Sequence, residues 1–264
     1  MEELLLGEVE VNLFLLAMLE GWEVDRLPWV GVLDGDALRA VALVLPGQVA
    51  VAYAPEAAHG ALMGSAAPPF QPDTLVIGPR DASDQLWSTW ASGQRWGRRY
   101  NQRLYVAREP SARSTLPGLR LARAADEEEL LARSIQMEID DLGFDPSTRN
   151  PESFRYSVQR RIQEGRTWVL EEGGRLLYHI NVGVQVSWGC QIGGTYVPPA
   201  LRGQGIATEA TRQIVSRLLE RNPIVTLHVN EANTPAVRVY ERAGFQRAAP
   251  FRLITTPARP ETQR

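Results

Sequence analysis

The feature that constrains this chain most is a turn between a strand and a helix with closely spaced glycines. An extended apolar run ends at Val197, two prolines follow, and Arg202-Gly-Gln-Gly-Ile-Ala207 opens an amphipathic helix. The first N–H groups of a helix lack intrahelical acceptors and carry partial positive charge, which favours an anion there. Gly203 and Gly205 keep side chains away from that anion, and Arg202 adds a forked cationic donor. We therefore expect this turn to bind a phosphate-bearing ligand.

The spacing of this turn does not fit the common nucleotide motifs. A Walker loop needs a lysine, which this chain lacks, and the dinucleotide fingerprint needs three glycines that open a βαβ unit. The pattern Arg-x-x-Gly-x-Ala resembles the pyrophosphate-binding loop of the GNAT acyl-CoA N-acyltransferases. Downstream, Asn233 to Phe245, which includes Tyr240 and Gly244, is similar to the second signature of that family and lies at the expected distance.

The resemblance implies a role for each residue that matches these motifs. In GNAT enzymes the strand before the loop pairs with the pantetheine arm, an asparagine contacts CoA, and a tyrosine lies near the thioester sulfur. The implied cosubstrate is acetyl-CoA, the implied catalytic acid is Tyr240, and no metal is expected. The implied cosubstrate contacts are Thr195, Tyr196, Val197, Arg202, Gly203, Gln204, Gly205, Ile206, Ala207, Thr208 and Asn233.

Two interpretations remain open around this predicted site. Gly193-Gly194 either forms a β-bulge that separates the strand from its neighbour or marks close packing. The phenol of Tyr240 either stabilises the departing thiolate or anchors its helix in the core.

The sequence does not single out a general base. The strand position at which many GNAT enzymes have a glutamate is uncharged here, and base catalysis by water is also open. An acidic run at 138–141 either attracts a cationic amine or is a solvated helix end. The candidate bases are His179, His228, Glu231 and Glu138, and the acidic run consists of Glu138, Asp140 and Asp141.

The C-terminal half predicts an α+β fold of mixed α/β type, which the resemblance implies is the GNAT fold. We expect this domain to span residues 117–264, after a proline-bounded linker. The predicted elements are strand Leu119–Arg123, helices Asp126–Ile139 and Pro151–Glu164, strands Thr167–Leu170, Arg175–Val184 and Trp188–Val197, the helix after the loop, strand Ile224–Val229 and a short helix with Tyr240.

The N-terminal half, residues 1–112, predicts a degenerate GNAT-like domain without catalytic function. In a GNAT domain the phosphate loop would follow the strands of the meander. The segment at that position, Ala54 to Gly60, has neither the arginine nor the glycine spacing of such a loop. The sequence is similar to a GNAT subgroup that has an uncharacterised GNAT-like N-terminal domain. The predicted elements are helix Glu8–Gly21, strands Trp29–Leu33, Leu38–Leu45, Val49–Tyr53 and Thr74–Gly78, and a helix Asp81–Ser92 that Asp81 caps.

A cluster of tryptophans and arginines follows in this half. It is either a stacking surface for nucleic acid or, as we favour, a helix that buries its indoles and exposes its arginines. The net charge of -3, from 28 basic and 31 acidic residues, provides no field that attracts nucleic acid. The cluster comprises Trp87, Trp90, Trp96, Arg95, Arg98, Arg99 and Arg103.

Composition excludes several other classes of protein. A hydrophobic fraction of 44% with 22% charged residues is typical of a globular protein. The N-terminus lacks the basic start of a signal peptide, and no apolar run approaches the ~20 residues of a membrane helix, so a cytoplasmic protein without membrane partners is expected. The lone Cys190 is either a nucleophile or, as its apolar strand favours, a core residue.

The sequence therefore predicts an N-acetyltransferase that transfers the acetyl group of acetyl-CoA to an amine of a small molecule or peptide. The alternative is a non-catalytic acyl-CoA-binding sensor on the same fold. The acceptor, the acyl-chain preference, the role of the N-terminal domain and the oligomeric state are left open.

Overall fold

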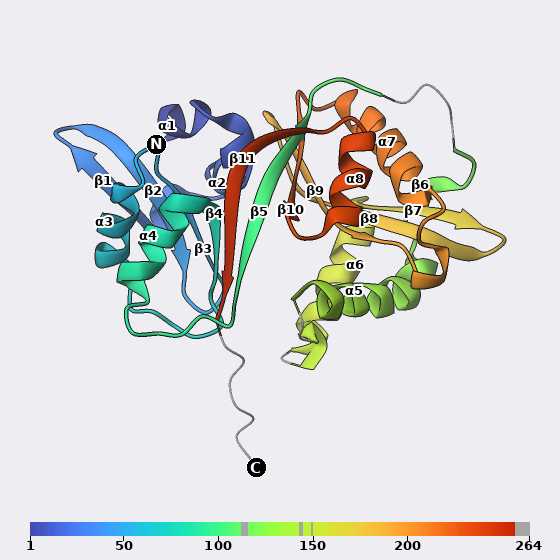
Figure 1. The fold of residues 1–264 in the computed structure, drawn as a ribbon, viewed down its shortest axis with the longest axis horizontal. Helices are drawn as coiled ribbons and strands as arrows, with labels where there is room; N and C mark the ends of the chain where they lie inside the picture. The colour runs from blue at the N-terminus through green and yellow to red at the C-terminus, as the bar shows by residue number, and fades with distance from the viewer. Residues whose placement is uncertain (112–115, 143–144, 149, 257–264) are drawn as a thin grey trace, which may run out of the picture. The chain divides into compact units, whose positions relative to one another are not determined.

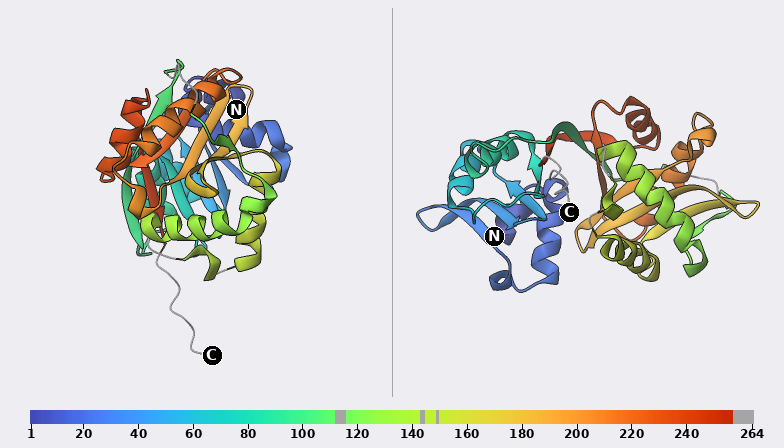
Figure 2. Two further views of the ribbon diagram at one scale, coloured as in Figure 1. Left: turned by 90° about the vertical axis from the view of Figure 1, so that its right-hand side faces the viewer. Right: turned by 90° about the horizontal axis from the view of Figure 1, so that it is seen from below.

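The computed structural model describes residues 1–111, 116–142, 145–148 and 150–256 (Figures 1 and 2). These residues form two compact units, each of which combines segments that are distant in the sequence. The first unit contains Met1–Val106, His228–Val237 and the chain from Arg247, and the second contains Ala107–Leu227 and Arg238–Gln246.

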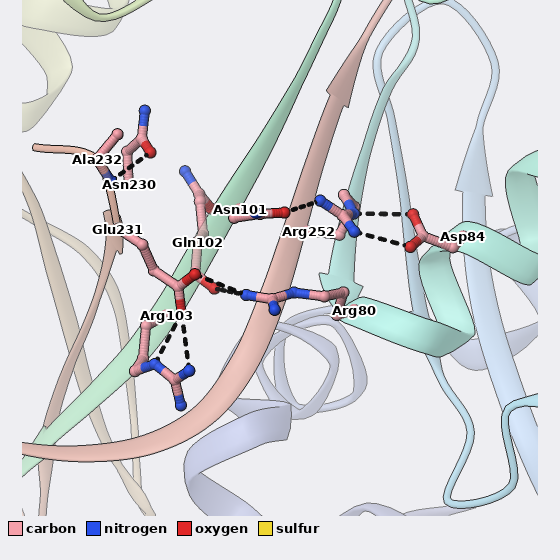
Figure 3. Close-up of polar contacts among 9 residues, drawn as sticks. All are labelled: Arg80, Asp84, Asn101, Gln102, Arg103, Asn230, Glu231, Ala232 and Arg252. Carbon is pink, nitrogen blue, oxygen red and sulfur yellow. Dashed lines mark hydrogen bonds and ion pairs between the residues drawn. The ribbon is translucent and has the colours of Figure 1, made fainter.

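The last strand, β11 (Gln246–Thr255), explains why the units are not consecutive segments. It pairs antiparallel with β4 (Leu75–Pro79), so that Ile254 lies opposite Val76 in the first unit. Arg252 on β11 is 7% exposed and donates from Nε and Nη2 to the Asp84 carboxylate at 2.8 and 2.9 Å (Figure 3). The sequence analysis did not predict this strand, and the domain segments 1–112 and 117–264 stay a prediction.

The sheet of the first unit has the strand order β1-β2-β3-β4-β11-β5. The pairs β1–β2 and β2–β3 are antiparallel, and β3–β4 is parallel. The predicted meander and the predicted strand at 74–78 are confirmed. The remaining strands are β1 (Trp29–Asp34), β2 (Ala37–Leu45), β3 (Val49–Tyr53) and β5 (Arg98–Ala107).

Small residues on one face of this sheet let bulky side chains pack from above. Alanines of β2 and β3 form a core with Met63, Trp87 and Trp90 of α3 and α4. Figure 2 shows α3 and α4 on one face of the strands and the N-terminal helices on the other. The helices are α1 (Glu2–Leu6), α2 (Val9–Gly21), α3 (Ala58–Ala66) and α4 (Arg80–Trp90), with the 3-10 turn η1 (Val24–Arg26).

Three predictions for this unit were wrong or incomplete. The helix α3 was missed, because its Ala- and Gly-rich sequence has no amphipathic period. Pro79, not Asp81, is the N-cap of α4, and no side chain caps it. Arg98, Arg99 and Arg103 lie on strand β5, not on a helix.

The sheet of the second unit has the order β10-β9-β8-β7-β6. The pair β10–β9 is parallel and the other pairs are antiparallel. The predicted turn at Gly173-Gly174 joins β7 to β8 with positive φ at both residues. These strands, all predicted, are β6 (Leu119–Leu121), β7 (Thr167–Glu172), β8 (Arg175–Val186), β9 (Gly189–Tyr196) and β10 (Val225–Asn230).

Helices cover both faces of this second sheet (Figure 1). The helices α5 (Glu127–Leu142) and α6 (Pro151–Gln163) pack together on one face, and α7 (Ile206–Leu219) lies on the other with the end of α8 (Thr234–Arg242). The expected α+β class is confirmed, and none of the described helices is long and apolar enough to cross a membrane. Short 3-10 turns are η2 (Ala124–Asp126), η3 (Pro146–Thr148) and η4 (Pro199–Leu201).

We predict that Gly64→Ala destabilises the first unit, since α3 packs against α4 through its glycines. A Cβ at residue 64 would lie 2.1 Å from Thr89 Oγ1 and 2.6 Å from the Leu86 carbonyl oxygen. Overpacking of this kind costs about 1–3 kcal/mol, which exceeds the ~1 kcal/mol that alanine gains over glycine in a helix. Urea unfolding measures the loss.

The matched control is Gly21→Ala at the end of α2, where a Cβ meets no atom within 4 Å. This variant should be neutral or slightly more stable than the wild type. Equal stabilisation of both variants would contradict the close packing of α3 on α4.

Candidate functional site

The strand β9 contains one extra residue near its end. His179 on β8 pairs with Tyr196, and Asn181 pairs with Gly193, so two steps along β8 match three along β9. Gly194 has φ +62, and a Cβ there would lie 2.5 Å from Asn181 Nδ2. The glycine pair therefore forms the predicted bulge and also permits close packing.

The other edge of β9 is paired over a short length. In the second unit β10 pairs with β9 at Val225↔Cys190 and Thr226↔Gln191. Within the second unit, the last pair between the two strands is Thr226↔Gln191, whereas β9 continues to Tyr196. A strand edge of this kind offers backbone N–H and C=O groups to an extended ligand.

The predicted phosphate loop has the backbone of an anion site. Gly203 has φ +79, and Gly205, the N-cap of α7, has φ +81. A Cβ at either position would meet no atom within 4 Å, so a side chain would have room. Glycine is favoured at both positions because of the positive φ of the backbone. The first intrahelical bond runs from Glu209 N to the Gly205 carbonyl oxygen at 3.1 Å. The N–H groups of residues 206–208 precede that bond and project from the helix end.

Arg202 links this loop to α5. Its Nε donates to the Val197 carbonyl oxygen at 3.0 Å, and its Nη2 lies 3.4 Å from Asp140 Oδ2. The guanidinium carbon lies 5.7 Å from the centroid of the Tyr196 ring, and the side chain is 52% exposed. An exposed guanidinium in this position can offer further donors to a phosphate.

Tyr240 on α8 reaches β9 in the same unit. Its hydroxyl donates to Thr195 Oγ1 at 3.1 Å, and its ring meets that of Phe245 edge to face at 6.0 Å. The residue is 8% exposed. Burial and the charge of Asp141 raise the pKa of the phenol, although the bond to Thr195 opposes them. Two predicted site residues, Tyr240 and Thr195, are thus in direct contact.

A second pair of hydroxyls lies behind β9 and was missed by the sequence analysis. Tyr178 of β8 is fully buried, and its hydroxyl lies 2.8 Å from Thr211 Oγ1 on α7. Burial raises the pKa of Tyr178. In the sequence, Tyr178 alternates with Leu176 and Ile180 and is therefore expected to point into the core. An apolar core residue gives the same pattern, so the pattern did not reveal the hydroxyl pair.

Two of the candidate bases are poor bases in this structure. His179 is 0% exposed, and burial together with the charges of Arg133 and Arg161 lowers its pKa to about 3. Burial lowers the pKa of His228, in the first unit, to about 4. Such imidazoles stay neutral near pH 7 and are weak proton acceptors.

Glu231, in the first unit, is occupied by arginines (Figure 3). Its carboxylate lies 3.0 Å from Arg80 Nη2 and 2.8 Å from Arg103 Nη2. Burial alone would raise its pKa, but the hydrogen bond from Arg103 and the two positive charges lower it. Its role here is to hold the two arginines.

Glu138 on α5 has the environment that suits a base. Burial, followed by the charge of Asp141, raises its pKa, and the charge of Arg161 partly opposes this. A carboxylate with a raised pKa holds a proton more firmly at neutral pH. Of the four candidates, Glu138 fits best.

Two further residues from the sequence analysis have environments within the protein that the structure describes, and the contact of Asn233 with CoA stays a prediction. Asn233 belongs to the first unit, where its Oδ1 accepts from Ala236 N at 3.3 Å at the start of α8, as an N-cap does. Cys190 is 0% exposed, and burial raises its pKa to about 12, which favours the core interpretation over a nucleophile.

Comparisons with known proteins agree with this geometry. Residues 134–245 match the model of the acetyltransferase (GNAT) family. No curated protein matches the chain. The resemblance inferred from the sequence motifs is confirmed for the C-terminal half.

Solved structures show the same fold across nearly the whole chain. A GCN5-related N-acetyltransferase from Sphaerobacter thermophilus is 20% identical, with a TM-score of 0.59 over 94% of this chain and 85% of that one. A GNAT-family acetyltransferase from Colwellia psychrerythraea is 14% identical, with a TM-score of 0.56 and coverages of 91% and 89%. A tandem GNAT protein from the clavulanic acid biosynthesis pathway is 12% identical, with a TM-score of 0.51 and coverages of 95% and 89%. The expected tandem GNAT-like architecture is therefore confirmed as a fold.

We predict that His179 makes the stability of the protein depend on pH. Its folded pKa, about 3, is below the usual 6.5, so the unfolded chain binds a proton that the folded chain excludes. The stabilisation is present above pH 6.5 and falls by about 1.4 kcal/mol per pH unit between about pH 6 and 4. In denaturant titrations across this range, His179→Gln should reduce the slope by that amount. An unchanged slope would contradict the burial of a neutral imidazole.

Proposed function

We propose that the protein transfers the acetyl group of acetyl-CoA to an amine of a small molecule or peptide, since residues 134–245 match the model of the GNAT acetyltransferase family. The observation that supports this most is the bond from Tyr240 to Thr195 on β9, the strand that leads into the glycine loop. It puts a proton donor beside the strand edge that the pantetheine arm would follow.

The cosubstrate would bind along β9 and the loop. The backbone of Thr195, Tyr196 and Val197 would pair with the pantetheine amides. The pyrophosphate would accept hydrogen bonds from the N–H groups at residues 203–208, and Arg202 would add charge. The positive φ of Gly203 and Gly205 supports this, since it directs successive N–H groups toward one point.

The acceptor amine would attack the thioester carbonyl carbon directly, and the C–S bond would break to release a thiolate. Tyr240 would donate its proton, or a short hydrogen bond, to that sulfur. Its raised pKa keeps the phenol protonated at neutral pH. A phenol with a pKa of ~10 or more donates to a thiolate, whose acid has a pKa of ~8.5, with some loss of driving force, so the hydrogen bond supplies most of the stabilisation.

The incoming amine has to lose a proton before or during attack. We assign this step to Glu138, directly or through a water molecule, because it is the candidate with a raised pKa. The neighbouring Asp140 and Asp141 would attract the cationic form of the amine.

A sensor that binds acyl-CoA without turnover is the competing function. The burial of Tyr240 against Phe245 is what a structural anchor would also need. The release of CoA in the presence of pooled amines distinguishes the two functions, because a sensor would release none.

We predict that Gly205→Val weakens acetyl-CoA binding by at least tenfold in calorimetry. A β-branched residue is strained at φ +81 and would move the helix N-terminus. The control is Gly174→Val, which is strained at φ +76 in the β7–β8 turn, outside the loop. Unchanged affinity in Gly205→Val, or an equal loss in both variants, would sink the assignment of the loop.

We also predict that Tyr240→Phe lowers kcat by ~100-fold to ~10,000-fold and leaves the Kd of acetyl-CoA nearly unchanged. The phenol acts on charge that appears at sulfur as the bond breaks, and such an interaction changes the rate more than ground-state binding. Steady-state kinetics and calorimetry give the two numbers. A variant that keeps its turnover but melts at a lower temperature would make Tyr240 a core anchor.

A further inference from the structure

Among the residues that the structure describes, the side chain of Arg161 on α6 has no anionic partner within ion-pair distance. It is half-buried, and no hydrogen bond or ion pair joins its guanidinium to another residue within the described parts of the chain. Burial lowers its pKa, and the charge of Glu138 opposes this from beyond ion-pair distance. A partly buried charge without an anionic partner has lost some of its hydration without compensation, so a bound anion would stabilise this position.

Other buried polar atoms on the neighbouring elements also lack hydrogen-bond partners among the described residues. Arg133 on α5 uses Nη2 to bind Glu129 and the Leu176 carbonyl oxygen, but its Nη1 is buried with no partner among the described residues. Both ring nitrogens of His179 are likewise buried and unpartnered. Arg133 contacts β8, the strand of His179, at the Leu176 carbonyl oxygen, and α6 packs beside α5, so the three side chains come from adjacent elements. The charges of both arginines also lower the pKa of His179.

This group adjoins the proposed acceptor side of the site. His179 stacks on Tyr196 with 5.8 Å between ring centroids. The guanidinium of Arg202 in the glycine loop lies 5.7 Å from the centroid of the same ring, and its Nη2 lies 3.4 Å from Asp140 Oδ2 in the acidic run of α5. On the same face of the sheet, the charge of Asp141 raises the pKa of Glu138, and the charge of Arg161 lowers it. Negative and positive groups are thus adjacent, as a ligand with an ammonium group and a carboxylate requires.

We propose that the acceptor is a free amino acid, whose carboxylate binds Arg161 with support from Arg133 while its amine lies toward Glu138 and Asp141. This inference rests on the proposed acetyl transfer and specifies its substrate class. An amine without a carboxylate would leave Arg161 and the Nη1 of Arg133 without an acceptor. Arg161 is thus a specificity residue that touches the substrate but not the reacting atoms.

The test measures CoA release from acetyl-CoA with each of the twenty common L-amino acids and with its carboxamide. At least one amino acid should be acetylated with a kcat/KM about 30-fold or more above that of its carboxamide. Arg161→Met should remove this preference, because the charge-assisted pair with the carboxylate is lost. Equal use of acid and carboxamide by the wild type, or a preference that survives in Arg161→Met, would overturn the proposal.

The adjacent arginine provides a matched control. Arg160 is 62% exposed and pairs with Glu164 at 2.7 Å, so Arg160→Met should keep the preference for the free carboxylate. Ligand-free Arg161→Met should melt at or above the temperature of the wild type, since an unpaired charge has been removed. A clear fall in melting temperature would show that Arg161 already has a partner, and would overturn the proposal.

Failure of the acetyltransferase proposal can be distinguished from failure of the amino-acid proposal. If no amine of any kind releases CoA, the acetyltransferase proposal fails, and calorimetry with the same twenty amino acids then tests the subsite alone. Binding by the wild type and by Arg160→Met, but not by Arg161→Met, would support the subsite. Absence of binding to the wild type would overturn it.

Discussion

The extra residue in β9 is the constraint on which the rest of the site depends. At Gly194 the backbone adopts φ +62, and the pairing of β9 with β8 shifts by one residue between Gly193 and Tyr196. The shift lets Thr195 meet Tyr240 of α8 and Tyr196 stack on His179 of β8. The strand then leads through Arg202 to the N-terminus of α7. A regular strand of the same length would turn these side chains to the opposite faces.

The elements that could be predicted from the sequence are those that depend on residues close together in the chain. The strands, the glycine turn and α7 follow from apolar periodicity and from residues that tolerate positive φ, all within a short span of chain. The strand β11 was missed because it is defined by pairing with β4, far away in the sequence. The strand β5 was mistaken for a helix because its arginines were interpreted with the tryptophans of α4. The helix α3 is held by close packing of Gly60 and Gly64 on α4, which periodicity does not detect.

The chemistry of the site follows from environments that a sequence does not contain. Four residues were equivalent candidates for a base until burial and neighbouring charges separated them. His179 and His228 are held neutral, Glu231 binds two arginines, and Glu138 has a raised pKa. Arg161, whose charge acts on Glu138, was not recognised from the sequence, because the lack of a partner for a guanidinium can be seen only when its neighbours in the fold are known.

The most direct measurement is a crystal structure of the protein with acetyl-CoA. We expect the pyrophosphate oxygens to accept hydrogen bonds from the N–H groups at the start of α7, and the thioester sulfur to lie within hydrogen-bond distance of the Tyr240 hydroxyl. A pyrophosphate bound away from the Gly203–Gly205 turn, or a sulfur that Tyr240 does not reach, would contradict the proposed mechanism.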